Sequence, residues 1–150
     1  MDTRDNDTNR ATNNAEKELT VDPKKVLVVD DSKLMHKMYE VMLRQYVLVH
    51  AMDGEEASQE LAAHDDVDLV LLDINMPRMG GLEFLDHMGY QDKDKDLPPV
   101  IIVSTEGKEE DTQRGLEAGA VAYIKKPFSS VQLTEVISQM PEDIRGGEGA

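Results

Sequence analysis

Short apolar runs recur along the chain, and each is bounded by residues that interrupt regular structure. The runs cover residues 25–29, 47–51, 67–73, 99–103 and 121–124. Runs of this length, flanked by glycine, proline or polar clusters, are typical of strands buried on both faces. The pattern therefore predicts five short buried strands.

Between these runs, apolar residues recur at helical spacing, which predicts helices over about 33–45, 55–64, 82–89, 109–118 and 130–140. Ser32 and either Ser129 or Ser130 precede two of them as candidate N-caps, and Asp53-Gly54 is a turn at which a third helix starts. In the first helix we expect a methionine-rich stripe to face the core, with Leu34 beside it and exposed. The apolar residues of this helix are Leu34, Met35, Met38, Val41, Met42 and Leu43.

Strict alternation of strands and helices indicates an α/β fold. Such alternation gives parallel strands, right-handed crossovers and helices on both faces of the sheet. We expect a doubly wound, five-stranded parallel sheet with five helices in a three-layer α/β/α arrangement.

The composition indicates one domain with polar ends. Residues 1–22 are rich in Asp, Asn and Thr and hold little apolar surface to offset their ordering entropy. We expect a disordered acidic tail over 1–22, the folded domain over 23–141 and a flexible tail over 142–150. Because only these few residues follow the last helix, we expect no output domain.

The charge and the residue types exclude several classes of function. The formal net charge of −15 argues against nucleic acid and against anionic lipid surfaces as partners. The chain has no cysteine, so neither disulfides nor thiol chemistry are available. No run of 18 apolar residues and no apolar leader is present, so we expect a cytoplasmic protein. We also expect it to be a monomer.

Polar residues with possible chemistry follow four of the five predicted strands. They are Asp30 with Asp31, then Asp73, Ser104 and Lys126. Since the carboxyl ends of parallel strands share one edge, these side chains are expected to meet there. Three neighbouring carboxylates repel one another unless a hard cation lies among them, and Mg²⁺ (or Mn²⁺) suits such oxygen donors.

A carboxylate surrounded by Mg²⁺, an ammonium and a hydroxyl is a site for a phosphoryl group. The metal and Lys126 would neutralise charge on the phosphoryl oxygens, and Asp73 would be the nucleophile that forms an acyl phosphate. Each residue alone has a plainer explanation, such as a strand-end cap or a turn hydroxyl. The prediction depends on all of them occurring at the same ends of successive elements.

The motifs together resemble the receiver domains of response regulators in two-component signalling. The segments that carry the resemblance are Val28-Val29-Asp30-Asp31-Ser32, the stretch from Leu71 to Gly81, Val103-Ser104-Thr105 and Lys126-Pro127-Phe128. The likeness covers about residues 24–140 and implies a flavodoxin-like (CheY-like) fold.

The resemblance also implies roles for the residues of the site. Asp73 would be the phosphoacceptor. Asp31, Asp73 and the backbone carbonyl of Asn75 would bind Mg²⁺, with Asp30 acting largely through water. Lys126 would contact the phosphoryl group.

Other residues would carry the response. The resemblance implies that Ser104 moves to hydrogen-bond the phosphoryl group while Tyr123 turns inward, which would remodel the last helices. It also implies a cis peptide at Lys126-Pro127. Asn75 and Glu106 match positions that tune dephosphorylation in CheY-like receivers, although both are equally well explained as polar loop residues. Thr105 replaces a smaller residue, and its effect on phosphoryl lifetime stays open.

We therefore expect a single-domain response regulator in chemotaxis, motility control or a phosphorelay. Its phosphodonor would be a histidine kinase or a histidine phosphotransfer domain, and a downstream protein would bind the face of the last helices. One alternative is a haloacid-dehalogenase-like phosphatase, although Asn75 replaces the general acid that such enzymes need. Another is a phosphorylation-independent scaffold. A flavin-binding protein is disfavoured because Asp30 and Asp31 would repel the cofactor phosphate.

Overall fold

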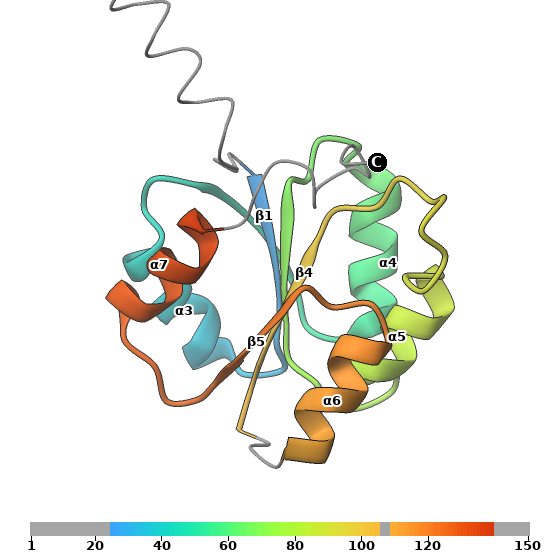
Figure 1. Cartoon of the computed structure of the whole chain (residues 1–150). Coiled ribbons are helices and arrows are strands. Elements are labelled where there is room, and N and C mark those ends of the chain that lie inside the picture. Colours follow the sequence, from blue (N-terminus) through green and yellow to red (C-terminus); the bar gives the residue numbers. More distant parts are fainter. Residues whose placement is uncertain (1–24, 106–108, 140–150) are drawn as a thin grey trace, which may run out of the picture.

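Five strands and five helices alternate within the part of the chain that the structure describes, residues 25–105 and 109–139 of a computed structural model (Figure 1). In chain order they are β1 (Lys25–Val29), α3 (Lys33–Met42), β2 (Val47–Ala51), α4 (Gly54–Ala63), β3 (Leu69–Leu72), α5 (Gly81–Met88), β4 (Val100–Ser104), α6 (Glu109–Glu117), β5 (Ala122–Lys125) and α7 (Ser130–Ser138). The predicted tails, the predicted domain limits and Glu106 lie outside the described residues.

All five strands form one parallel sheet in the order β2-β1-β3-β4-β5. The order reverses between β1 and β3, because the chain runs outward to β2 and then crosses back. The predicted doubly wound α/β fold is confirmed. Open sheets of this kind bind their ligands beyond the carboxyl ends of the strands, at the point where the order reverses.

Two layers of helices cover the sheet. Figure 1 shows α3 and α7 on one face and α4, α5 and α6 on the other. Since alternate strand residues point to opposite faces, Val26 and Val28 pack on the side of α3 and α7, whereas Leu27 and Val29 pack on the side of α4 and α5. Both faces of β1, β3 and β4 are therefore apolar, as their continuous hydrophobic runs predict.

Helix α3 differs from its prediction. The helix ends at Met42, a few residues earlier than expected, and its inner face is formed by His36, Tyr39 and Leu43. Met38 and Val41 of the expected stripe are exposed, at 41% and 62%. The predicted exposure of Leu34 is confirmed. The predicted stripe is confirmed in part: Leu43 is buried and Met35 and Met42 pack against the core, whereas His36 and Tyr39 occupy core positions that the apolar pattern left out.

Three predicted helix starts are confirmed by side-chain caps. The hydroxyl of Ser32 accepts a hydrogen bond from the Met35 N–H, and Asp53 and Ser129 accept equivalent bonds at the starts of α4 and α7. Each cap satisfies a backbone donor that the first helical turn leaves without a partner. Because the caps at Ser32 and Asp53 directly follow β1 and β2, they fix how the chain turns at the carboxyl edge of the sheet.

Candidate functional site

Asp30 and Asp73 lie side by side because the sheet ladder continues one residue past β1 and β3. The Asp73 N–H donates to the Val29 carbonyl at 3.0 Å, and the Asp30 N–H donates to the Ala51 carbonyl at 3.1 Å. These bonds fix both backbones at the carboxyl edge of the sheet. The side chains that follow the two central strands therefore meet where the strand order reverses.

The carboxylates of Asp30, Asp31 and Asp73 form one cluster, with an oxygen from each lying within 4.8 Å of the others. Asp30 and Asp73 are buried, whereas Asp31 is exposed and borders solvent. Hard divalent cations prefer oxygen ligands of this kind, and Mg²⁺ needs only one or two carboxylates. The donor set therefore fits Mg²⁺ and leaves room for water and phosphate oxygens on the open side.

Lys126 places a positive charge at the inner side of this cluster. Its Nζ lies 2.7 Å from Asp30 Oδ2 and 3.8 Å from Asp73 Oδ2. The backbone N–H of Lys126 donates a hydrogen bond to the Ser104 carbonyl at 2.8 Å, which continues the pairing of β5 with β4. The peptide bond to Pro127 is cis, as the resemblance predicts.

Burial raises the pKa of the Asp73 carboxyl above its usual range. The nearby Lys126 opposes this rise, whereas Asp30 adds to it, and hydrogen bonds from the Ser104 hydroxyl and the Asn75 N–H again favour the charged form. The net direction is upward. Without a cation, the ionised form of Asp73 beside Asp30 is therefore disfavoured. A divalent metal bound between the carboxylates would remove this cost and stabilise the site.

The remaining predicted residues lie at different depths around the site. Asn75, in the loop after β3, and Thr105, directly after β4, are exposed. Ser104 is fully buried at the end of β4. Tyr123 is half-buried in β5, and it packs with the core residues on the α4 and α5 side. The structure therefore brings Asp30, Asp31, Asp73, Ser104 and Lys126 together, while Tyr123 lies beneath the neighbouring surface.

Tyr39 is a residue near the site that the sequence pattern did not single out. It is buried in α3, and its ring lies against that of Phe128, with centroids 6.3 Å apart. Burial, followed by the charges of Asp30 and Asp73, raises its pKa, so the phenol stays neutral. The Lys126-Pro127-Phe128 motif thus continues from the acidic cluster into the core beneath it.

An ion pair between Asp53 and Arg78 was also not predicted, and it links the β2–α4 turn to the β3–α5 loop. The Gly54 N–H donates to the Met79 carbonyl at 2.8 Å across the same junction. Burial raises the pKa of Asp53, but hydrogen bonds from the Glu56 N–H and from Arg78 outweigh it and hold the pKa below its usual value. These contacts hold the β3–α5 loop, which contains Asn75.

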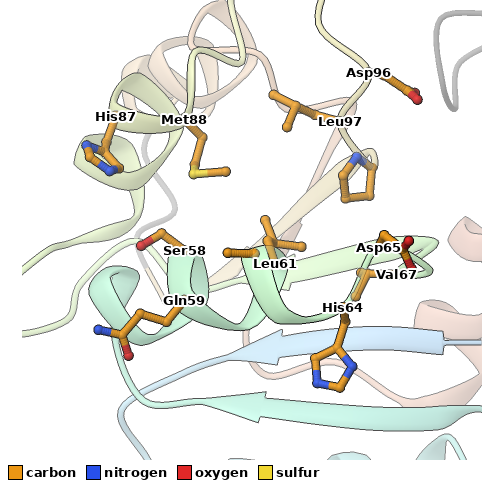
Figure 2. Close-up of a pocket in the computed structure, with 12 residues that line it drawn as sticks. Ser58, Gln59, Leu61, His64, Asp65, Val67, His87, Met88, Asp96 and Leu97 are labelled. Carbon is orange, nitrogen blue, oxygen red and sulfur yellow. The ribbon is translucent and has the colours of Figure 1, made fainter.

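A hollow of the described surface lies away from the acidic cluster. Figure 2 shows it between α4 and α5, with Leu61, His87 and Met88 around it, and its volume is about 680 Å³. The residues that line it include Val67 and Leu97, which precede β3 and β4. It therefore opens at the amino edge of the sheet, opposite the carboxylates, and has no part in their chemistry.

Comparisons with known proteins agree with this geometry. The family model described as "Response regulator receiver domain" matches residues 26–138. A chemotaxis protein CheY homolog from Campylobacter jejuni is 36% identical over 132 residues, which cover 84% of this chain and 98% of the relative. The phosphate regulon transcriptional regulatory protein PhoB of Escherichia coli is 37% identical over 112 residues, 73% of this chain and 48% of PhoB.

Solved structures show the same fold. Vibrio cholerae chemotaxis protein CheY4 superposes with a TM-score of 0.67 at 32% identity, over 75% of this chain and 94% of that one. A CheX–CheY–BeF3–Mg²⁺ complex from Borrelia burgdorferi gives a TM-score of 0.68 at 33% identity, over 75% of this chain and 85% of its own. No helix among the described residues is long and apolar enough to cross a membrane.

Proposed function

The chain belongs to the family of response regulator receiver domains, and we propose that it is a single-domain response regulator phosphorylated on Asp73. The observation that carries this proposal is the convergence of Asp30, Asp31 and Asp73 within 4.8 Å of one another, with the Lys126 ammonium 3.8 Å from Asp73. A buried nucleophilic carboxylate, a cation site and a fixed positive charge are the parts that phosphoryl transfer needs.

In the proposed reaction a carboxylate oxygen of Asp73 attacks the phosphorus of a phosphohistidine. The P–N bond breaks, the electron pair stays on the histidine nitrogen, and an acyl phosphate forms on Asp73. The donor is a histidine kinase or a histidine phosphotransfer domain. Lys126, at 2.7 Å from Asp30, needs to shift only a short way to contact an oxygen of the incoming group.

Asp30, Asp31 and Asp73 would hold Mg²⁺, together with the backbone carbonyl of Asn75. When bound, Mg²⁺ supplies positive charge that stabilises the phosphoryl oxygens. Asp31 is exposed, so it faces the side from which the donor and water approach. Asp30 is buried and accepts a hydrogen bond from the Ser32 N–H at 2.9 Å, which keeps its carboxylate oriented towards the cluster.

The output we propose is a change in the surface formed by α6, β5 and α7. The Ser104 hydroxyl, which is bonded to Asp73 in this structure, would follow the phosphoryl group outward. That movement would free space into which Tyr123, now half-buried on the α4 and α5 side of the sheet, would turn further inward. A downstream protein would bind the altered surface. The Borrelia burgdorferi relative was solved in complex with CheX, which is consistent with signalling through protein contacts.

The test is Mg²⁺-dependent labelling by radioactive acetyl phosphate or a cognate kinase. Wild type should be labelled, and Asp73→Asn should not. Asp86→Asn, which changes an exposed carboxylate of α5, is the matched control and should be labelled like wild type. Equal labelling of wild type and Asp73→Asn would contradict the assignment.

A further inference from the structure

Half-buried apolar side chains line the hollow between α4 and α5. Figure 2 shows Leu61 of α4, Met88 of α5 and Leu97 of the α5–β4 loop around one space. Leu61 and Met88 also pack against the core on this side of the sheet. The volume of about 680 Å³ lies in the range in which proteins enclose small ligands, roughly 300–1,000 Å³. Apolar side chains that entered this space would therefore extend the core outward.

The first strand begins directly beside this hollow. The Lys25 N–H donates to Asp68 Oδ2 at 3.1 Å, and the Asp68 N–H donates to the Lys25 carbonyl at 2.8 Å. The Lys25 ammonium also binds Asp66, at 2.9 Å. Val67, which lies between these two aspartates in the sequence, is one of the lining residues. The residues that precede Lys25 are thus tethered at the rim of the hollow.

The sequence before Lys25 holds two large aliphatic residues at a spacing that suits an extended chain. Leu19 and Val21 flank Thr20, and residues 2–24 contain no other leucine, valine, isoleucine or methionine. In an extended chain, residues two positions apart point to the same side. Pro23 favours an extended conformation at the residue before it. Leu19 and Val21 could therefore enter one hollow together, with Thr20 facing solvent.

The tether is long enough to reach the hollow and short enough to favour docking. Val21 precedes Lys25 by four positions and Leu19 precedes it by six. An extended chain spans about 3.3–3.6 Å per residue, so these tethers reach roughly 13 Å and 20 Å. A short tether also gives an effective concentration in the mM range. Two buried side chains therefore need only a weak affinity for the hollow.

Charge and chain direction both favour this segment as the occupant. Asp65 and Asp96 are exposed residues of the lining, and Lys17, two positions before Leu19, has the opposite charge. The residues at the C-terminal end of the chain follow α7 instead. That helix covers the opposite face of the sheet, away from α4 and α5 (Figure 1).

We propose that Leu19 and Val21 dock in the hollow lined by Leu61, Met88 and Leu97, within the same chain. The docked segment would cover apolar surface that α4 and α5 leave half-exposed, and it would tie the residues before β1 to both helices. Because the hollow lies at the opposite edge of the sheet from the acidic cluster, docking leaves the proposed phosphorylation site open. The predicted disordered tail would then end before residue 17 rather than at residue 22.

The test is paramagnetic broadening of methyl signals in the full chain. The protein has no cysteine, so Ala15→Cys provides a single thiol for a nitroxide label, four positions before Leu19. We expect the label to broaden the methyl signals of Leu61 and Met88. The methyl signals of Leu34, which is exposed on α3 at the other face of the sheet, should stay sharp. Uniform broadening of all three residues would overturn the proposal.

A charge scan of the segment supplies matched variants in the labelled chain. Leu19→Asp and Val21→Asp should each weaken docking by at least about tenfold, because each loses the burial of an aliphatic side chain. The selective broadening should then disappear. Thr20→Asp adds the same charge at the position that faces solvent, so it should keep the broadening. Equal loss in all three variants would mean that charge alone matters, and would contradict the docking.

Two further measurements identify the hollow and the occupant. Leu97→Gln changes the lining from the loop side and should reduce the broadening at Leu61 and Met88, whereas an unchanged pattern would exclude this hollow. Spin-labelled chains are then mixed with isotope-labelled wild-type chains that carry no nitroxide. We expect no broadening in this mixture, because docking occurs within one chain. Broadening there would mean that the segment of a second copy fills the hollow.

Discussion

The ammonium of Lys126 is bonded to Asp30, at 2.7 Å from Oδ2, while the Oδ2 of Asp73 lies farther away at 3.8 Å. The lysine thus neutralises the buried carboxylate that the resemblance assigns to a water-mediated role. It stays close enough to Asp73 to reach a phosphoryl group built upon it. The two aspartates therefore compete for one ammonium, and phosphorylation would change which of them holds it.

We predict that Lys126→Gln slows phosphorylation of Asp73 by acetyl phosphate by about 10²-fold, as expected when one preorganised donor to a developing charge is lost. The neighbouring Lys125 is exposed at the end of the same strand and serves as the control. Lys125→Gln should react at the wild-type rate. Single-turnover labelling measures both, and equal slowing in the two variants would mean that only net charge matters.

We predict that Mg²⁺ stabilises the fold through the acidic cluster. A ligand that binds only the native state at a hundred times its Kd raises the free energy of unfolding by about 2.7 kcal/mol. Asp30→Asn removes one buried carboxylate and should lose most of this gain. Urea unfolding with Mg²⁺ and with a chelator measures the difference, and Asp86→Asn should keep the wild-type gain. An undiminished gain in Asp30→Asn would exclude Asp30 from the metal site.

Asp73 should contribute a pH-dependent term to stability in the absence of metal. Its pKa is raised in the native state, so the native state binds the proton more tightly than the unfolded chain does. The stabilisation is complete below the unfolded pKa, about 3.9, and is lost as pH rises through the native pKa. Asp73→Asn should lack this decline in chelator-containing buffer. Parallel pH profiles for variant and wild type would contradict the upward shift.

The β3–α5 loop allows a test of backbone strain. Arg78 has a φ of 62°, in the left-handed region, and its side chain pairs with Asp53. Arg78→Gly and Arg78→Ala both remove the pair, but only alanine keeps the strain, which costs about 1–2 kcal/mol. The glycine variant should be the more stable by that amount in urea unfolding. Equal stabilities would mean that the loop relaxes on losing the ion pair.

Ser104 should separate phosphorylation from output. Ser104→Ala keeps the acidic cluster, so we expect Mg²⁺-dependent labelling of Asp73 to persist. Because the variant lacks the hydroxyl that would follow the phosphoryl group, affinity for a partner captured with the beryllofluoride-activated protein should change little on activation. Ser58→Ala, which alters a hydroxyl of α4 away from the proposed output surface, should keep the full change. An unaltered difference in Ser104→Ala would exclude this switch.

The sequence predicted the sheet well because continuous apolar runs have few other solutions. It also predicted which residues meet, since Asp30, Asp73 and Lys126 follow strands, and Ser104 ends a strand, whose carboxyl ends share an edge. These inferences need only topology. The pairing of Lys126 with Asp30 needs side-chain distances, which a pattern of residue types does not contain.

The inner face of α3 was predicted only in part, for a related reason: Met35, Met42 and Leu43 face the core as expected, but two further residues do so as well. A hydrophobic pattern treats histidine and tyrosine as polar, yet His36 is buried because the Asp30 carbonyl and His50 satisfy its nitrogens. Tyr39 is buried because its ring packs against Phe128, which is far away in the sequence. The contact between Asp53 and Arg78 likewise joins two loops that the sequence places apart.

The bond between Lys126 and Asp30 joins residues 96 positions apart, and β3 and β4 lie between their strands in the sheet. A ribosome therefore makes nearly the whole domain before the lysine can reach the carboxylate, and the C-terminal half of the sheet must already be in place. Chains that stop before β5 carry Asp73 without its ammonium. Under the proposed function, nascent and truncated copies would be phosphorylated far more slowly, so that the phosphorylated protein would consist mainly of finished molecules.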